Sequence, residues 1–337
     1  MVKRIMAKVA VIGATTWGNT LGRLLADKGV MVSVWARTEA KAKELKQEHQ
    51  GLLSKNVSAD CLSFTGSIEE TLNLAELVVC AVPAQRMRQN LRLCSPHVDS
   101  SVILVSAAKG LEAETGKRMS EVIAEEVAAV SQDRICALSG PNLSGEINQG
   151  LPATSIIAGQ DMEVAKKVQG LLDSPNFSVF PSDDIVGVEL CGALKNVIAL
   201  GAGIMDGLDL GNNAKAAFIT IGWSEVVSLG VAMGAKSGTF YGLAGLGDLV
   251  ATGNSLLSRN HYVGYELGKG RPLSDILASM SHVAEGVDTA IAAHRLANRL
   301  SLETPIINLI YSVLFESLPP AEISRRFKNG LKPESTA

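Results

Sequence analysis

Short runs of apolar, largely β-branched residues alternate with longer amphipathic stretches through the first half of the chain. The stretches between the runs repeat their apolar residues with a helical period and carry charge on the outer face. Unbroken apolar runs are typical of parallel strands that helices bury on both faces. We therefore predict strands at 8–13, 30–36, 77–83, 101–107, 135–140 and 153–159, with helices over 19–29, 39–51, 84–94 and 116–130.

The strand pattern ends near residue 187, and the remainder of the chain predicts helices joined by short loops. We expect an α/β fold with an N-terminal Rossmann-like domain, residues 1–187, whose sheet is mostly parallel, followed by an all-α domain, residues 188–337. Segment 187–208 mixes glycine and alanine with large apolar residues. Because glycine inside a helix costs about 1 kcal/mol relative to alanine, this predicts another element packed closely on that helix. The tail after Lys328 shows no helical or strand periodicity and is expected to be loose.

Composition narrows the possible functions. The chain has 337 residues, 47% apolar and 19% charged, and a formal net charge of −3, as expected of a packed globular protein. No basic run with interleaved aromatic residues occurs, so we expect no nucleic-acid partner. Lys195, Asn196 and Asp206 interrupt the apolar stretch around 197–205, so no membrane span is expected. Gly13 ends the apolar run near the start of the chain, which favours a domain element over a signal peptide and predicts a cytoplasmic location.

Cysteine and histidine spacing predicts no metal site. The five cysteines are scattered without a C-x-x-C pair, and the five histidines show no H-E-x-x-H or similar spacing. We expect buried free thiols in a reducing compartment.

A glycine-rich turn follows the first predicted strand. It reads Gly13-Ala14-Thr15-Thr16-Trp17-Gly18, which matches G-x-G-x-x-G at the first and third glycines and has threonine at the second. In this motif the first glycine permits a tight turn, the second lets a pyrophosphate approach the backbone, and the third lets helix and strand pack closely. The turn opens a helix, as a dinucleotide site requires, although Thr15 narrows the approach. A structural turn without a ligand is the alternative.

The end of the second predicted strand bears on cofactor choice. Rossmann domains usually place an acidic residue there to bind the ribose 2′-hydroxyl of NAD, whereas this chain has Arg37. A guanidinium suits a 2′-phosphate, so NADPH is favoured over NADH. The alternative is that Arg37 is a solvated surface charge.

Four blocks carry a more specific signal: SAAKGLE at 106–112, LSGPN at 138–142, ELCGALKN at 189–196 and GLAGLGDLVATGNSLLSRN at 242–260. Together they resemble the NAD(P)-dependent glycerol-3-phosphate dehydrogenases, in the order and at the spacing of that family, from Gly13 to about Phe315. The resemblance implies reduction of dihydroxyacetone phosphate to sn-glycerol 3-phosphate with NADH or NADPH, feeding glycerophospholipid synthesis. It also implies a homodimer.

The resemblance implies a role for each matching position around the reacting carbon. Lys195 matches the catalytic lysine, which exchanges a proton with the C2 oxygen of the substrate, and Lys109 matches a second lysine that contacts substrate and cofactor. Asp248 matches the carboxylate beside the catalytic lysine, and Thr252 a nearby hydroxyl. Gly140 matches a substrate contact.

Further matches concern the substrate phosphate and the dinucleotide. Ser258, Arg259 and Asn260 match the segment that grips the phosphate, with Arg259 also near the cofactor. Asn142 falls among the substrate contacts and Ser144 among the cofactor contacts, although the family usually has serine or threonine at the first and alanine at the second. The remaining cofactor contacts implied by the resemblance are Gly13, Thr15, Thr16, Trp17, Gly18, Val283 and Glu285.

The chemistry explains why lysine is needed. Reduction of a ketone builds negative charge on oxygen, which an ammonium stabilises and can protonate. Burial and a second cation, which could be Lys109, lower the pKa of such a lysine, whereas Asp248 opposes this shift, so the sequence does not predict the balance. An isolated lysine is usually a solvated surface charge, but Lys195 lies in an apolar predicted helix, which favours the functional interpretation. Asp248 could instead only cap a helix.

Departures from the family pattern leave rival functions open. Besides Thr15 and Asn142, Ile221 stands where arginine is common. One rival is another Rossmann-plus-helical dehydrogenase acting on a different hydroxy acid or polyol phosphate. The other is a protein that binds the dinucleotide with little or no turnover, a hypothesis that rests on Thr15.

Overall fold

The structure is a computed structural model that describes residues 7–49, 58–253 and 258–328. It divides into two compact units, and each is described by itself. Unit 1 comprises residues 1–108 and 119–188, and unit 2 comprises residues 109–118 and 189–337. The short segment 109–118 therefore groups with the helical second half, an assignment that the sequence pattern does not predict. The predicted loose tail after Lys328 lies outside the described residues.

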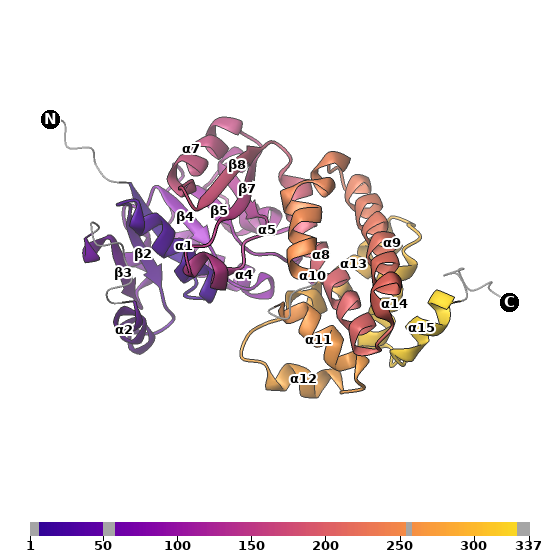
Figure 1. Cartoon of the computed structure of the whole chain (residues 1–337). Coiled ribbons are helices and arrows are strands. Elements are labelled where there is room, and N and C mark those ends of the chain that lie inside the picture. Colours follow the sequence, from indigo (N-terminus) through magenta and orange to yellow (C-terminus); the bar gives the residue numbers. More distant parts are fainter. Residues whose placement is uncertain (1–6, 50–57, 254–257, 329–337) are drawn as a thin grey trace. The chain divides into compact units, whose positions relative to one another are not determined.

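Unit 1 contains an eight-stranded sheet with the strand order β3-β2-β1-β4-β5-β6-β7-β8 (Figure 1). All neighbouring strands are parallel except β6 and β7, which confirms the predicted mostly parallel sheet. The six predicted strands are present as β1 (Lys8–Ile12), β2 (Met31–Trp35), β4 (Leu77–Cys80), β5 (Ile103–Ser106), β6 (Ile135–Ser139) and β7 (Ala153–Gly159). Two further strands, β3 (Leu62–Thr65) and β8 (Phe177–Ser182), form the two edges of the sheet.

Helices cover both faces of this sheet, as unbroken apolar strands require. In β1, Val9 and Val11 join the hydrophobic core that contains Leu21 of α1 (Thr16–Asp27). Ile12, on the opposite face, joins the core that contains Met87 of α4 (Ala84–Cys94). The other helices of unit 1 are α2 (Glu39–Glu48), α3 (Ile68–Leu72), α5 (Met119–Glu126), α6 (Ser144–Asn148) and α7 (Met162–Leu172).

Helix α1 begins three residues earlier than predicted and α5 three residues later. Thr15 causes the first difference, because its side chain accepts a hydrogen bond from Gly18 N and so caps the helix. The predicted helix over 39–51 is seen as α2, and residues 50 and 51 lie outside the described part. All five cysteines, Cys61, Cys80, Cys94, Cys136 and Cys191, are buried free thiols as predicted.

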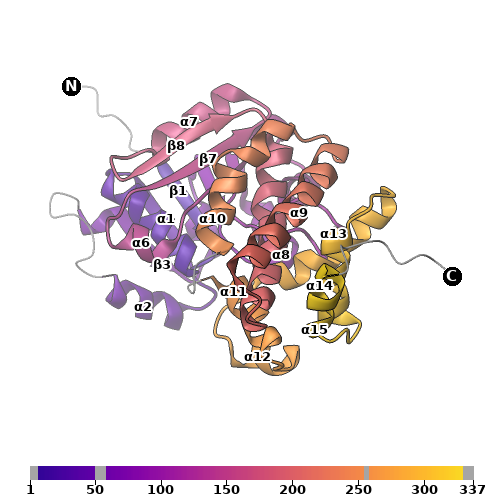
Figure 2. The same cartoon turned by 45° about the vertical axis from the view of Figure 1, so that its right-hand side comes forward.

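Within its described residues, unit 2 is helical. It contains α8 (Ile185–Gly207) from Glu189 onward, α9 (Gly211–Ala232), α10 (Asp248–Gly253), α11 (Arg259–Gly268), α12 (Leu273–Ser279), α13 (Glu285–Arg299), α14 (Pro305–Phe315) and α15 (Ala321–Lys328). The predicted close packing on α8 is confirmed, because α11 lies directly against its glycines (Figure 2). A Cβ atom added to Gly203 would lie 2.1 Å from the carbonyl oxygen of His261, and one added to Gly264 would lie 1.9 Å from that of Leu200.

Two helices, α8 and α9, are long and apolar enough by length and composition to cross a membrane. Lys195, Asn196 and Asp206, which interrupt the apolar stretch in the sequence, lie within α8 and do not break the helix. The apolar window of α8 is 94% buried inside the protein, which identifies α8 as the core helix of unit 2.

Candidate active site

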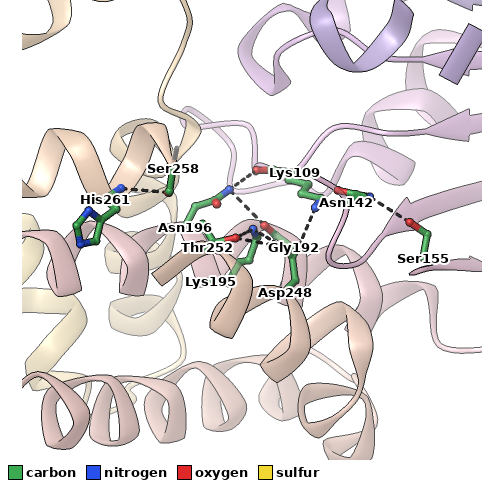
Figure 3. A network of polar contacts seen from close by, with 10 residues as sticks. All are labelled: Lys109, Asn142, Ser155, Gly192, Lys195, Asn196, Asp248, Thr252, Ser258 and His261. Atoms are coloured by element: carbon green, nitrogen blue, oxygen red, sulfur yellow. Dashed lines mark hydrogen bonds and ion pairs between the residues drawn. The ribbon is translucent and has the colours of Figure 1, made fainter. Parts of the chain in front are cut away.

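Lys195 lies in the middle of α8 and is buried, with 4% of its surface exposed. Its Nζ donates hydrogen bonds to Asp248 Oδ1 at 2.7 Å and to Thr252 Oγ1 at 2.6 Å. Figure 3 shows these three side chains converging from α8 and α10. A buried ammonium is tolerated only when it is paired and hydrogen-bonded, and Asp248 and Thr252 meet both conditions.

Asp248 is the first residue of α10 and follows the glycine-rich turn Leu243–Gly247. Its carboxylate contacts two lysines, because Oδ2 accepts from Lys109 Nζ at 2.7 Å while Oδ1 accepts from Lys195. Asp248 thus lies in the first turn of a helix, and its carboxylate bridges both lysines. Thr252 lies one helical turn later and donates to Asp248 Oδ1 at 3.2 Å.

Lys109 belongs to segment 109–118 and packs with unit 2. Its side chain is 18% exposed, more than that of Lys195. The amide of Asn196 fixes its backbone, since Asn196 Nδ2 donates to the Lys109 carbonyl oxygen at 2.9 Å and to that of Gly192 at 3.3 Å. The sequence predicted no role in the site for Asn196. Its position beside Lys195, as a second polar residue in an apolar helix, was the available signal.

The environment lowers the pKa of Lys195 to about 8. Burial is the main cause, because it disfavours the ammonium, and the Lys109 ammonium acts in the same direction. The Asp248 carboxylate opposes both by charge and by its hydrogen bond. Of these opposing influences, which the sequence does not rank, burial prevails.

The segment matched to phosphate binding opens α11. Ser258 caps this helix, its Oγ accepting from His261 N at 3.3 Å, and Arg259 Nη1 donates to the carbonyl oxygen of Val283 at 3.0 Å. Asn260 is buried, and its Oδ1 accepts from Gly286 N at 2.9 Å.

The start of α13 joins these residues to α8. A Cβ atom added to Gly286 would lie 2.7 Å from Asn196 O and 2.9 Å from Asn260 Oδ1. Asn260 is therefore a near neighbour of the residue that follows Lys195. Glu285 is the first residue of α13, and Val283, two positions earlier, is exposed.

Three predicted site residues lie in unit 1, after strand β6. Gly140 has φ +140°, and a Cβ atom there would lie 2.9 Å from Ser155 Cα, so the turn requires glycine. Asn142 Nδ2 donates to the buried Ser155 Oγ at 3.1 Å, and Ser144 is the first residue of α6. Asn142 thus has a structural partner that secures this turn.

The glycine-rich turn has the geometry of a dinucleotide loop. Gly13 has φ +109°, and a Cβ atom added to it would lie 2.6 Å from Val82 Cγ1. A Cβ atom added to Gly18 would lie 2.1 Å from Gly13 O, so the first and third glycines act as the motif requires. Thr16 is exposed, and Trp17 is half-buried with Nε1 lacking a partner among the described residues.

Thr15 fits this turn without the second glycine. Its φ is −80°, which any residue adopts, and its Oγ1 donates to Ala81 O at 2.9 Å while accepting from Gly18 N at 3.0 Å. The hydroxyl is thus bound within the protein, and it satisfies one of the N–H groups that a helix start leaves without a carbonyl partner. The turn therefore accommodates Thr15 without strain, as the residue that caps α1.

Arg37 is exposed just beyond β2, with no ion pair to any residue that the structure describes. Among residues 7–49, 58–253 and 258–328, no group of three or more histidine, cysteine, aspartate or glutamate residues is placed to hold a metal ion. Ile221 is exposed on α9.

Comparison with known proteins gives one consistent result. Residues 8–165 match the family model described as the NAD-dependent glycerol-3-phosphate dehydrogenase N-terminus, and residues 184–325 match that of its C-terminus. A curated relative from Dehalococcoides mccartyi, named glycerol-3-phosphate dehydrogenase (NAD(P)+), is 51% identical over 95% of this chain and 90% of its own length. A relative of the same name from Syntrophotalea carbinolica is 43% identical over 97% and 99%.

A solved structure agrees with these relatives. The crystal structure of glycerol-3-phosphate dehydrogenase from Coxiella burnetii is similar with a TM-score of 0.88 at 30% identity, covering 96% of this chain and 99% of that one.

Proposed function

We infer the roles of these residues from one premise, that the chain belongs to the NAD-dependent glycerol-3-phosphate dehydrogenase family. It is an NAD(P)-dependent oxidoreductase that interconverts dihydroxyacetone phosphate and glycerol 3-phosphate. The observation that supports our assignment of the chemistry most directly is the buried Lys195 ammonium, bonded to Asp248 and Thr252.

Lys195 is the proton donor in our proposal. The reduced nicotinamide, when bound, supplies hydride to C2, and the Lys195 ammonium stabilises and protonates the oxygen that becomes negative. Asp248 and Thr252 accept two of the three Nζ hydrogens, so the third direction remains for the substrate oxygen. Lys109, bonded to the second oxygen of Asp248, places another positive charge beside the site. We also propose that it contacts substrate and cofactor, as the matching lysine of the family does.

The substrate phosphate binds at the start of α11 in this proposal. Arg259 supplies a planar cation, and Asn260 and Ser258 supply polar atoms beside it, a combination that suits a terminal phosphate. The short distances around Gly286 support this assignment, because they bring Asn260 next to the residue after Lys195. Gly140 and Asn142 remain proposed substrate contacts, and Ser144, Val283 and Glu285 remain proposed cofactor contacts.

The cofactor is NADH or NADPH, and we propose that NADPH is preferred. The exposed Arg37 supports this preference, since it stands where an acidic residue would otherwise bind the 2′-hydroxyl of NADH. Gly13, Thr15, Thr16, Trp17 and Gly18 form the proposed pyrophosphate loop at the start of α1.

The test is an initial-rate assay with each cofactor on the native chain and on Lys195→Ala. The native chain should oxidise NADPH when dihydroxyacetone phosphate is added, and Lys195→Ala should lower kcat by about a thousandfold, in the range of positioned acid catalysis. The Lys195→Ala variant should still bind NADPH, which a change in the fluorescence of NADPH on binding shows. Equal turnover by the variant would refute the assignment of Lys195.

We also propose the wider setting of the enzyme. It works in the cytoplasm as a homodimer, takes part in glycerophospholipid synthesis, and is divided functionally into residues 1–187 and 188–337. The family membership supports these proposals, and light scattering of the purified chain tests the dimer.

A further inference from the structure

A buried histidine in α11 connects this helix to the end of α8. His261 is 3% exposed, and its Nε2 lies 2.8 Å from Asp206 Oδ2. Lys215 of α9 lies 3.0 Å from the same carboxylate. Because Asp206 has an ammonium as its counter-ion and can only accept, we assign the proton of the His261 bond to Nε2. His261 Nδ1 is buried without a partner among the described residues, so the Asp206 bond is the one that directs the ring.

The two helices joined by this bond otherwise meet through glycines. Gly203 and Gly207 of α8 face the backbone of His261 and Tyr265, and Gly264 and Gly268 of α11 face the backbone of Leu200 and Ile204. The contacts advance in the same direction along both helices. These glycines already restrict the register sterically, because a Cβ atom in the place of Gly203, Gly207 or Gly264 would meet a backbone oxygen. The contact offers few side chains to orient the helices, and the directional His261–Asp206 bond adds a polar constraint on register, as buried polar residues do in coiled coils.

The register of α11 determines where its first residues lie. Arg259 and Asn260 directly precede His261, and Lys195 and Asn196 belong to α8. A slip of one helical turn would move Arg259 and Asn260 by about 5.4 Å along α8. Such a shift would separate Asn260 from Gly286 and carry the phosphate-binding groups away from the ammonium.

We propose that His261 and Asp206 form a positioning pair that holds α11 in register on α8 and thereby sets the affinity for the substrate phosphate. This inference rests on the proposed binding of the phosphate by Arg259 and Asn260. Neither His261 nor Asp206 contacts the reacting atoms, so their effect should fall on KM rather than on kcat.

The experiment measures kcat, KM for dihydroxyacetone phosphate and the competitive inhibition constant of inorganic phosphate on the full chain. His261→Ala and Asp206→Ala should each raise KM and the phosphate inhibition constant about tenfold. kcat should change less than about twofold, since Lys195 keeps its partners. The double variant should be no worse than either single variant, because both remove the same bond. Asp206→Asn keeps the side-chain shape and should raise KM and the phosphate inhibition constant by a smaller factor. This variant replaces the alanine variants in the test if they do not fold.

Glu225→Ala is the matched control. Glu225 is also buried in unit 2, but it bonds to Ile306 N and Ile307 N of α14 and not to α11. The Glu225→Ala variant should have a lower free energy of unfolding than the native chain and the same KM for dihydroxyacetone phosphate. The inference is overturned if folded His261 and Asp206 variants keep the native KM, or if the control raises KM equally. Arg259→Ala and Asn260→Ala separate the two proposals: if these variants bind phosphate normally, the phosphate site itself is misassigned.

Discussion

At the scale of single residues, Lys195 combines two opposing influences on one ammonium. Burial among apolar neighbours disfavours the charge, and Asp248 favours it. If Asp248 fully offset the effect of burial, the lysine would hold its proton too tightly to donate it. Without Asp248, burial would make the lysine lose its proton below neutral pH. The resulting pKa of about 8 leaves the side chain protonated at neutral pH and still able to exchange its proton.

A pH dependence follows from this value. Reduction of dihydroxyacetone phosphate needs the protonated Lys195, so kcat/KM should fall as the pH rises through about 8. Oxidation of glycerol 3-phosphate needs the neutral amine, so its rate should rise through the same range. Because the Lys109 ammonium lowers the pKa of Lys195, Lys109→Met should move both inflections to higher pH.

Lys109→Arg, which keeps the positive charge, is the control and should leave the inflections in place. Rates measured in both directions from pH 6 to 10 check this. An inflection that Lys109→Met leaves unmoved would contradict the role of the second cation.

Single residues also show how far the sequence predicts the site. The burial of Lys195 could be predicted because its neighbours in the chain are apolar. The roles of Asn196 and Asp206 could not, because each depends on a partner distant in sequence, the carbonyl oxygen of Lys109 in one case and His261 in the other. The motif suggested that Thr15 narrows the approach of the pyrophosphate, because the sequence alone does not show that its hydroxyl caps α1.

At the scale of elements, the strands that the sequence failed to predict are those at the edges of the sheet. Interior strands are buried on both faces and therefore read as unbroken apolar runs. In contrast, β3 alternates polar and apolar residues, and β8 contains Pro181, which an edge strand tolerates because it needs fewer backbone donors. The glycines of α8 were informative for the opposite reason, because their cost in a helix required a packing explanation.

That explanation predicts the effect of adding a methyl group. Gly203→Ala should reduce the free energy of unfolding by about 2–3 kcal/mol, because the new Cβ would lie 2.1 Å from a backbone oxygen of α11, which cannot move alone. Gly170→Ala in α7 is the control: a Cβ there meets nothing within 4 Å and should stabilise by about 0.5–1 kcal/mol. Urea unfolding of the two variants gives both values, and similar values for the two would refute close packing of α8 on α11.

A second prediction at this scale concerns the carboxylate of Glu225 on α9. It accepts from Ile306 N at 2.8 Å and Ile307 N at 2.9 Å at the start of α14, but burial prevails and raises its pKa from 4.5 to about 7. Between these values the folded state binds more protons than the unfolded state, so the free energy of unfolding falls as the pH rises from 4.5 to 7. Titration of this group contributes on the order of 3 kcal/mol to that fall.

Glu225→Gln, which mimics the protonated acid, should remove this part of the pH dependence. Urea unfolding at pH 5 and pH 8 checks it. The idea fails if the variant loses as much stability between the two pH values as the native chain does.

At the scale of the whole molecule, the chain passes between its two units three times: after residue 108, after residue 118 and after residue 188. Within unit 2, Arg118 Nη1 donates to Glu189 Oε2 at 2.8 Å, and both side chains are largely buried. This ion pair lies within unit 2 and links the last residue before the second passage to the first residue after the third. At the first passage, Asn196 holds the backbone of Lys109. Unfolding of unit 2 should therefore free the ends of the unit 1 chain at these passages.

Calorimetry tests this coupling with 2′-phospho-ADP-ribose, the part of NADPH that we assign to the pyrophosphate loop and Arg37 of unit 1. At about 100 times its Kd this ligand should stabilise unit 1 by about 2.7 kcal/mol, and in the native chain the whole unfolding transition should move to higher temperature. In Arg118→Met the buried Glu189 loses this cation, so unit 2 should unfold first, in a transition that the ligand no longer shifts.

Lys166→Met is the control. It removes an exposed ion pair with Glu163 on α7 and should behave like the native chain, because such pairs contribute little. A native chain that already showed a separate transition unaffected by the ligand would mean that the units unfold independently, and that the three passages do not couple them.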